Sequence, residues 1–209
     1  MEIKPITIAG CGPGSLEYVT PAALRAIEQA EVLVGARRLL ESFPAVAAQR
    51  IVVGADVPQA LDAMAKHFGQ RRIVVLVTGD PGLCSLARPV LQRFGRGACR
   101  VIPGISSVHA AFASVGIDWF GARILSAHDS APDIDPASLV SEEKLAVLAG
   151  NPANAAWVES LAVAMTATHD LFVCENLTLA DTSVRHVERM PMNLASRTVL
   201  LFIKKEESL

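Results

Sequence analysis

The sequence lacks the features of membrane-spanning and nucleic-acid-binding proteins. Uninterrupted apolar runs are short, as in Ile73 to Val77, whereas a membrane helix needs about 20 apolar residues. Neither charge dominates: 19 basic and 21 acidic residues give a net charge of −2, so no global field attracts nucleic acid. The N-terminus begins with a strand-like segment and has no signal-peptide pattern. We therefore predict a cytoplasmic protein that binds neither membrane nor nucleic acid.

Cysteine is also scarce. The four cysteines lie far apart and form no C-x-x-C pair: Cys11, Cys84, Cys99 and Cys174. This spacing predicts neither a zinc site nor a disulfide framework, and no metal is expected. A reduced, cytosolic chain is the simplest interpretation.

A glycine-rich turn near the N-terminus is the most informative feature. An apolar strand, Ile6 to Ala9, runs into Gly10-Cys11-Gly12-Pro13-Gly14, which the proline stiffens. Thr20-Pro21 follows as an N-cap and a first-turn proline, and predicts a helix through Ala30. Because glycine leaves the backbone bare, a ligand can approach it closely, although a simple tight turn has the same pattern.

This turn lacks what two common nucleotide motifs require. The dinucleotide fingerprint needs a glycine where this chain has Ser15, and an acidic residue after the second strand, Val32 to Val34. A phosphate-binding P-loop ends in Gly-Lys-Ser/Thr, whereas Gly14 is followed by Ser15-Leu16. A nicotinamide enzyme and a P-loop protein are therefore both disfavoured.

Short strands rich in Val and Ile alternate with helical stretches along 209 residues, half of them hydrophobic. This alternation predicts a parallel or mostly parallel sheet with covered faces, and a second group of strands follows it. We predict an α/β fold with two lobes, 1–117 and 118–209, and a ligand cleft between them. The predicted strands are 6–10, 31–34, 51–53, 73–78, 99–102, 123–127, 144–148, 171–174 and 198–203, and the predicted helices are 20–30, 57–68, 84–94 and 106–116.

Polar residues follow several of these strands. Asp80 sits in a Thr-Gly-Asp-Pro-Gly turn, where it can bond local backbone amides or face a cationic ligand. Ser106 and Ser107 begin a helix, one as an N-cap and the other free for a polar ligand. His109, among alanines, is expected to be packed, and His128, at a strand end, is the better histidine for chemistry.

Together these segments resemble the tetrapyrrole methylase superfamily. The matching signatures are GCGPGSLEYVT (10–20), VTGDPG (77–82) and PGISS (103–107). Further segments resemble the branch that methylates carbon 5 of precorrin-6B or cobalt-precorrin-6B in cobalamin biosynthesis: EVLVGARRLL (31–40), IPGISSVHAAFASVGIDW (102–119) and VCENL (173–177). The resemblance covers nearly the whole chain.

The resemblance implies a fold and a cofactor. The fold is the two-lobed tetrapyrrole methylase (class III S-adenosylmethionine-dependent methyltransferase) fold, with S-adenosylmethionine held between the lobes and a tetrapyrrole as substrate. A homodimer is also implied. The residues implied for the cofactor are Pro13, Gly79, Asp80, Leu83, Ser106, Ser107, Leu148, Glu175 and Asn176.

The glycine turn, with Gly10, Gly12 and Gly14, is implied to face the tetrapyrrole. The carboxylates of the tetrapyrrole could pair with Arg37, Arg38 and Arg123. Arginine is abundant in this chain, with 14 against 5 lysines, and each of these arginines can equally be a solvated surface residue. His128 is the nominee for a general base. No covalent nucleophile is needed, since the enzyme mainly positions donor and acceptor.

The chain departs from the family in places. Gly150 to Asp170 is alanine-rich, and Asp129 stands where relatives have glycine. The decarboxylating carbon-15 methyltransferase module fused to some relatives is absent, so a separate partner is expected to carry it. Alternatives are a methylase acting on uroporphyrinogen III or another precorrin, the diphthamide-forming branch, which fits poorly, and a non-catalytic corrinoid-binding protein.

Overall fold

The computed structural model describes residues 4–191 and 193–205. The chain divides into two compact units, Met1–Ser106 and Ser107–Leu209. We predicted this boundary eleven residues later, with the helix near 106–116 in the first unit. The structure instead places that helix, α5 (Ser107–Val115), in the second unit, because it packs against the last strand there. No helix among the described residues is long and apolar enough to cross a membrane.

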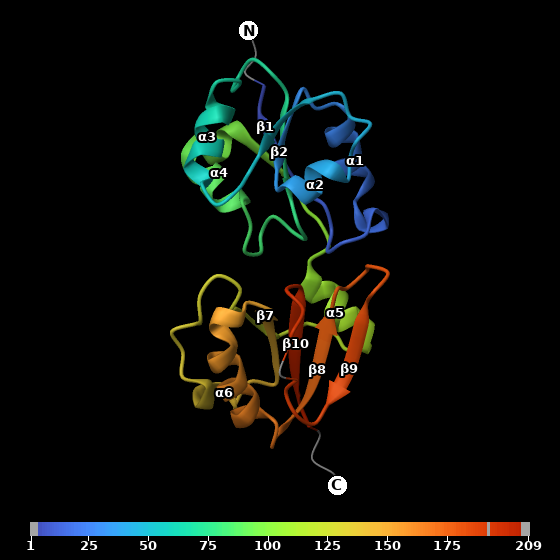
Figure 1. The fold of residues 1–209 in the computed structure, drawn as a ribbon, viewed down its shortest axis with the longest axis vertical. Coiled ribbons are helices and arrows are strands. Elements are labelled where there is room, and N and C mark those ends of the chain that lie inside the picture. The colour runs from blue at the N-terminus through green and yellow to red at the C-terminus, as the bar shows by residue number, and fades with distance from the viewer. Residues whose placement is uncertain (1–3, 192, 206–209) are drawn as a thin grey trace. The chain divides into compact units, whose positions relative to one another are not determined.

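The first unit is a five-stranded parallel sheet in the order β3-β2-β4-β1-β5 (Figure 1). Parallel pairing in register, such as Ile8 with Val75 and Val101, confirms the predicted sheet. All of β4 is buried, as expected for a strand covered on both faces. Its strands are β1 (Ile6–Gly10), β2 (Val32–Gly35), β3 (Gln49–Val52), β4 (Ile73–Val77) and β5 (Cys99–Ile102).

Helices cover both faces of this sheet. Thr20 caps α1 (Pro21–Glu28) through its Oγ1, which accepts a bond from the Ala23 amide, as the Thr-Pro pair predicted. Ala23 and Ile27 of α1 pack on one face with Leu33 and Leu76, while α3 and α4 cover the other. The remaining helices are α2 (Arg37–Glu41), α3 (Val57–Ala65) and α4 (Ala87–Phe94), with short 3-10 turns η1 (Leu16–Tyr18) and η2 (Arg96–Ala98).

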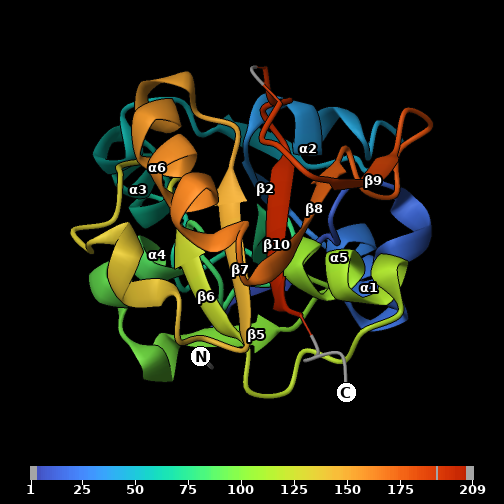
Figure 2. The same ribbon diagram turned by 90° about the horizontal axis from the view of Figure 1, so that it is seen from below.

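The second unit has a mixed sheet in the order β6-β7-β10-β8-β9, visible in Figure 2. Only β6 and β7 are parallel, whereas β10 is antiparallel to both of its neighbours. The mostly parallel arrangement predicted for the first group of strands does not extend here. The strands are β6 (Arg123–Ser126), β7 (Lys144–Ala149), β8 (His169–Glu175), β9 (Ser183–Val187) and β10 (Thr198–Lys204).

Two elements of the second unit were not predicted: α6 (Ala155–Met165) and β9. Leu161 and Met165 of α6 are buried against Val147 and Phe202. Helix α5 contacts β10 as well. The His109 ring lies against the Trp119 ring, tilted, with 4.6 Å between the ring centroids, so His109 is packed as predicted. Two further 3-10 turns are η3 (Pro136–Leu139) and η4 (Pro152–Asn154).

Candidate active site

The carboxyl ends of the parallel strands in the first unit gather at one edge of its sheet. There the turn after β1, Gly10 to Gly14, lies beside the turns that follow β4 and β5. The bonds are direct: the Cys11 amide donates to Val77 O at 2.9 Å, and the Gly79 amide donates to Gly12 O at 2.7 Å. The structure thus brings together the three signatures that are far apart in the sequence, at the edge where parallel sheets hold ligands.

Three backbones meet at what we call the glycine junction, made by Gly10, Gly79 and Gly104. A Cβ on Gly104 would lie 2.3 Å from Gly79 O, and one on Gly10 would lie 2.6 Å from Gly104 N. Glycine is therefore required at Gly10 and Gly104 because the neighbouring backbone fills the space of a side chain. For these two positions, close packing between strand ends explains the residue without any ligand.

Gly12 has a different reason to be glycine. Its φ is +72°, a conformation that other residues rarely adopt, and a Cβ would lie 2.9 Å from Tyr18 O. Gly12 and Pro13 are buried and Gly14 is half-buried. Leu16 and Tyr18, which follow in η1, expose apolar side chains beside this turn.

Asp80 ties two of the turns together. Its Oδ1 accepts the Gly82 amide at 2.7 Å within its own turn, and its Oδ2 accepts the Gly104 amide at 3.0 Å in the turn after β5. The Leu83 amide donates to Asp80 O at 3.1 Å and completes the turn. Of the two interpretations of Asp80, the structure shows the bond to backbone amides, and one of these amides is distant in sequence.

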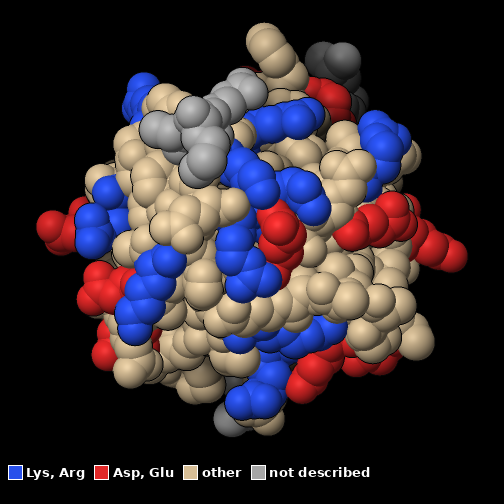
Figure 3. All heavy atoms as spheres, turned by 90° about the horizontal axis from the view of Figure 1, so that it is seen from above, with Lys and Arg blue, Asp and Glu red and all other residues tan. Residues whose placement is uncertain are grey.

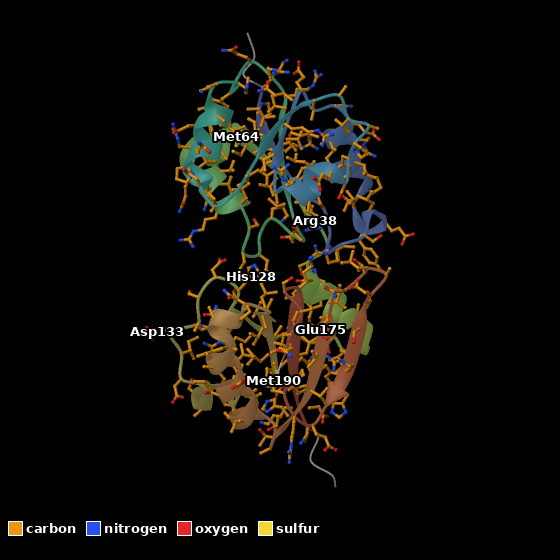
Figure 4. All side chains as sticks on the ribbon, viewed as in Figure 1. Arg38, Met64, His128, Asp133, Glu175 and Met190 are labelled. Atoms are coloured by element: carbon orange, nitrogen blue, oxygen red, sulfur yellow. The ribbon has the colours of Figure 1, made fainter. Side chains whose placement is uncertain are left out.

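The turn after β2 joins this edge through Arg38. Its Nη2 donates to Thr78 Oγ1 at 3.1 Å, which links α2 to the end of β4; Figure 4 labels Arg38. Arg37 is exposed, and its side chain makes no hydrogen bond or ion pair within the described ranges. Thr78 was not singled out from the sequence, although its place just before Gly79-Asp80 was a usable signal.

In the second unit, four candidates share one edge of the mixed sheet. Strands β6, β7 and β8 run in the same direction, so their carboxyl ends bring His128, Leu148, Glu175 and Asn176 to that edge (Figure 4 labels His128 and Glu175). Arg123 begins β6 at the opposite end of the strand and pairs with Glu142 at 2.6 Å. The structure therefore does not bring Arg123 to the other candidates.

Glu175 and Asn176 serve as structural residues at this edge. The Glu175 carboxylate accepts bonds from Arg185 at 2.6 Å and from the Ala195 amide at 2.8 Å. Asn176 has a φ of +49° and donates to Asp181 Oδ2 at 2.8 Å. Both side chains hold the turn after β8, and their predicted role toward a ligand is not visible in these contacts.

The turn after β6 is held by two asparagines that were not predicted from the sequence. Asn154 is buried and donates to Ala127 O at 2.7 Å, and Asn151 donates to His128 O at 2.6 Å. The His128 side chain is exposed, so its ring is open to solvent or to a ligand. The signal was the Asn-Pro-Ala-Asn run, which lies in the alanine-rich stretch where the family resemblance weakens.

The buried thiol of Cys11 lies inside the glycine turn. Burial raises its pKa to about 12, against the lowering effects of the Val77 backbone and of Arg38. Burial also raises the pKa of the Cys174 thiol to about 11, and the Glu175 carboxylate raises it further. Both thiols are therefore neutral at physiological pH, and since the thiolate is the reactive form, neither is suited to nucleophilic chemistry.

A labelling experiment checks whether the Cys11 and Cys174 thiols are buried and unreactive. Iodoacetamide at neutral pH should alkylate the exposed Cys84 in the native protein and leave Cys11 and Cys174 unmodified until urea unfolds the chain. Folding raises the pKa values of Cys11 and Cys174, so the unfolded chain loses these protons at lower pH than the folded chain. The stability that the two neutral thiols contribute is therefore complete below about pH 9 and decreases as the pH rises toward 12. Peptide mass spectrometry reads the labels, and alkylation of Cys11 as fast as Cys84 would contradict the buried placement.

The sequence and the fold are similar to those of known proteins. The family model for Tetrapyrrole (Corrin/Porphyrin) Methylases matches residues 5–189, and the chain belongs to this family. The family and the fold class predicted from the motifs are confirmed.

Three relatives are informative. The cobalt-precorrin-7 C(5)-methyltransferase of Salmonella typhimurium is 38% identical over 123 residues, which cover 59% of this chain and 61% of the relative. The match thus spans about three fifths of that relative's length. The precorrin-6Y methylase of Archaeoglobus fulgidus has a similar structure, with a TM-score of 0.73 at 24% identity, covering 97% of this chain and 98% of that one. A uroporphyrin-III C-methyl transferase from Thermus thermophilus, complexed with S-adenyl homocysteine, gives a TM-score of 0.75 at 18% identity, covering 95% and 97%.

Proposed function

We propose that this chain transfers a methyl group from S-adenosylmethionine to carbon 5 of precorrin-6B or cobalt-precorrin-6B. The observation that supports the proposal most is the edge of the first sheet, where the three family signatures are joined by the glycine junction and by Asp80. The choice of carbon 5 is supported by the identity with the Salmonella relative.

The charges within the turns after β1, β4 and β5 fit a sulfonium cofactor better than a phosphorylated one, and the Arg38 guanidinium, which reaches them from α2, donates to Thr78 Oγ1. Residues 10–16, 78–86 and 103–106 contain no lysine or arginine, and Asp80 is their only charged side chain. A phosphate site gathers basic groups or free amides. A positively charged sulfur is instead favoured near carbonyl oxygens and a carboxylate, which these turns supply.

S-adenosylmethionine, when bound, supplies a methyl group on a positively charged sulfur. The chain's part is to hold the ring carbon in line with that methyl, so that the new carbon–carbon bond forms as the carbon–sulfur bond breaks and its electrons stay on sulfur. Positioning of this kind is worth about 7–11 kcal/mol in the best cases. A rigid set of turns, fixed to one another by backbone bonds, suits that task.

Side chains at the strand ends complete the proposal. We propose that Arg37 and Arg38 pair with carboxylates of the tetrapyrrole and that His128 accepts the ring proton after methyl transfer. The exposure of the Arg37 and His128 side chains supports these roles. Arg123 is left out because of its position at the far end of β6 and its bond to Glu142. A homodimer and a separate carbon-15 methyltransferase partner stay predictions from the resemblance, and a cytoplasmic location stays a prediction from the composition.

A methyl-transfer assay tests the activity. Purified chain with precorrin-6B or its cobalt form and isotopically labelled S-adenosylmethionine should yield a product labelled at carbon 5, located by NMR. Methylation of uroporphyrinogen III in place of the precorrin would favour the rival methylase, the class to which the Thermus relative belongs. Binding of the precorrin with no transfer would favour a corrinoid-binding protein.

Calorimetric titration with S-adenosylhomocysteine tests the cofactor separately. We expect saturable binding, unchanged in Asp62→Ala, a control whose carboxylate is 72% exposed on α3. Absence of heat together with absence of a thermal shift would contradict the cofactor assignment whatever the substrate is.

A further inference from the structure

A hollow lies in the first unit, and none of its lining residues belongs to the turns that hold the family signatures. It has a volume of about 390 Å³, in the range of small-molecule sites. We call it the basic pocket. It is lined by Lys4, Pro5, Thr7, Ala22, Arg25, Ala26, Gln29, Arg72, Ile73, Val74, Arg100 and Ile102.

The fold explains why this space is open. Thr7 pairs with both Val74 and Arg100 in neighbouring strands, and together they form its floor on the face covered by α1. Ala22 and Ala26 lie one turn apart on α1 and present only methyl groups to the hollow. Strand β5 is the last in its sheet, so no neighbouring strand closes that side.

Four basic side chains line the basic pocket, in a protein whose net charge is −2. Lys4 and Arg72 share one carboxylate, that of Glu31, at 3.2 Å and 3.7 Å. Arg72 also donates to Gln29 O at 2.7 Å. Figure 3 shows basic side chains gathered near the middle of the face seen from above, with one acidic group among them.

The other two cations have no partner within the described part of the chain. The side chains of Arg25 and Arg100 make no hydrogen bond or ion pair there. Like charges around one hollow repel each other, and a concave wall focuses their field onto an anion that enters. Two free guanidinium groups can each bind a phosphate or a carboxylate through two parallel bonds.

We infer that the basic pocket binds a compact polyanion carrying two or more phosphate or carboxylate groups. Arg25 and Arg100 are its principal ligands, and Lys4 and Arg72 add charge while Glu31 holds them in place. This inference does not depend on the methyltransferase proposal, because the basic pocket shares no residue with the turns after β1 and β4 or with Asp80. It assigns a ligand to a hollow of the first unit that is lined by none of the residues of those turns.

Titration of the intact chain with inorganic tripolyphosphate and, separately, with citrate tests the inference at low salt. We expect saturable binding of at least one anion, weakened about ten-fold or more in the double variant Arg25→Gln/Arg100→Gln. The matched control is Arg88→Gln/Arg96→Gln, which removes two exposed arginines of the same unit that do not line the hollow. It should change the affinity by less than about two-fold.

The outcomes separate the explanations. A preference for tripolyphosphate assigns a phosphorylated ligand, and a preference for citrate assigns a polycarboxylate. If neither anion binds, or if both double variants weaken binding equally, the inference would be overturned in favour of diffuse surface charge. Thermal unfolding and S-adenosylhomocysteine titration of the Arg25→Gln/Arg100→Gln variant should match the wild type, which shows that any loss is local to the basic pocket.

Discussion

Replacing Gly104 with alanine should destabilise the protein by about 3 kcal/mol, near the upper end for overpacked sites. The new methyl would lie 2.3 Å from Gly79 O and 2.9 Å from two backbone atoms of Gly10. Backbone atoms in three joined turns cannot rotate away as a side chain can, so the strand ends must separate. Urea unfolding followed by circular dichroism measures the loss, and affinity for S-adenosylhomocysteine should fall with it.

Gly97→Ala is the matched control for this substitution. Nothing lies within 4 Å of its added methyl, and its φ is not positive, so the change should be within about 0.5 kcal/mol. Equal urea midpoints for the Gly104 and Gly97 variants would show that the glycine junction is not tightly packed.

Asp80→Ala should have the second largest effect. The substitution leaves the Gly82 and Gly104 amides without their acceptor and removes the hydrogen bond that joins the turn after β4 to the turn after β5. Hydrogen bonds to charged groups contribute about 1.5–3 kcal/mol each, and since Asp80 is only half-buried we expect a total loss of about 2 kcal/mol. Affinity for S-adenosylhomocysteine should fall by about ten-fold or more, because the turns no longer hold one geometry.

Asp80→Asn distinguishes geometry from simple loss of charge. It keeps the size and one acceptor, so it should lie between the wild type and Asp80→Ala in both stability and affinity. Asp62→Ala, which removes an exposed carboxylate of the same unit, should change neither. Full stability and full affinity in Asp80→Ala would mean that this carboxylate does not hold the site together.

The first unit was predictable because its signals are local. Buried runs such as Ile73–Val77, the Thr-Pro cap and the glycine turns each determine a short segment, and alternation of strands with helices determines a parallel sheet. The exception is α2, which was not among the predicted helices: Arg37 and Arg38 begin this short helix, and no side chain caps it.

The second unit was harder to predict for physical reasons. Helix α6 is apolar around much of its circumference and alanine-rich, so it lacks the sharp helical periodicity that marks α1. Strand β9 carries the exposed residues Arg185 and His186 at the edge of its sheet, and the sequence of this segment is typical of a polar loop. Its place in the sheet depends on pairing with β8, which a local pattern does not encode.

For the candidate site, the positions of the turns after the strands were predictable from the sequence, whereas the contacts between these turns were not. Gly10, Gly79, Asp80 and Gly104 all lie at one edge, as the positions after strands implied. The contact of Gly10 with Gly104 and the bond from Asp80 to Gly104 join residues 24 or more positions apart, and no single motif contains both partners. Arg123 was wrongly included among the candidates: it lies at the beginning of β6, whereas the other candidates of the second unit lie at the carboxyl ends of their strands.

The position of β10 has a consequence for how the chain is made. Every strand of the first sheet precedes residue 107, so that sheet can close on the ribosome while later residues are still being added. The second sheet has its middle strand, Thr198–Lys204, as the last of its five in chain order. Until that strand emerges, β7 and β8 have open edges, and a nascent chain stalled before residue 198 would expose them to chaperones and proteases.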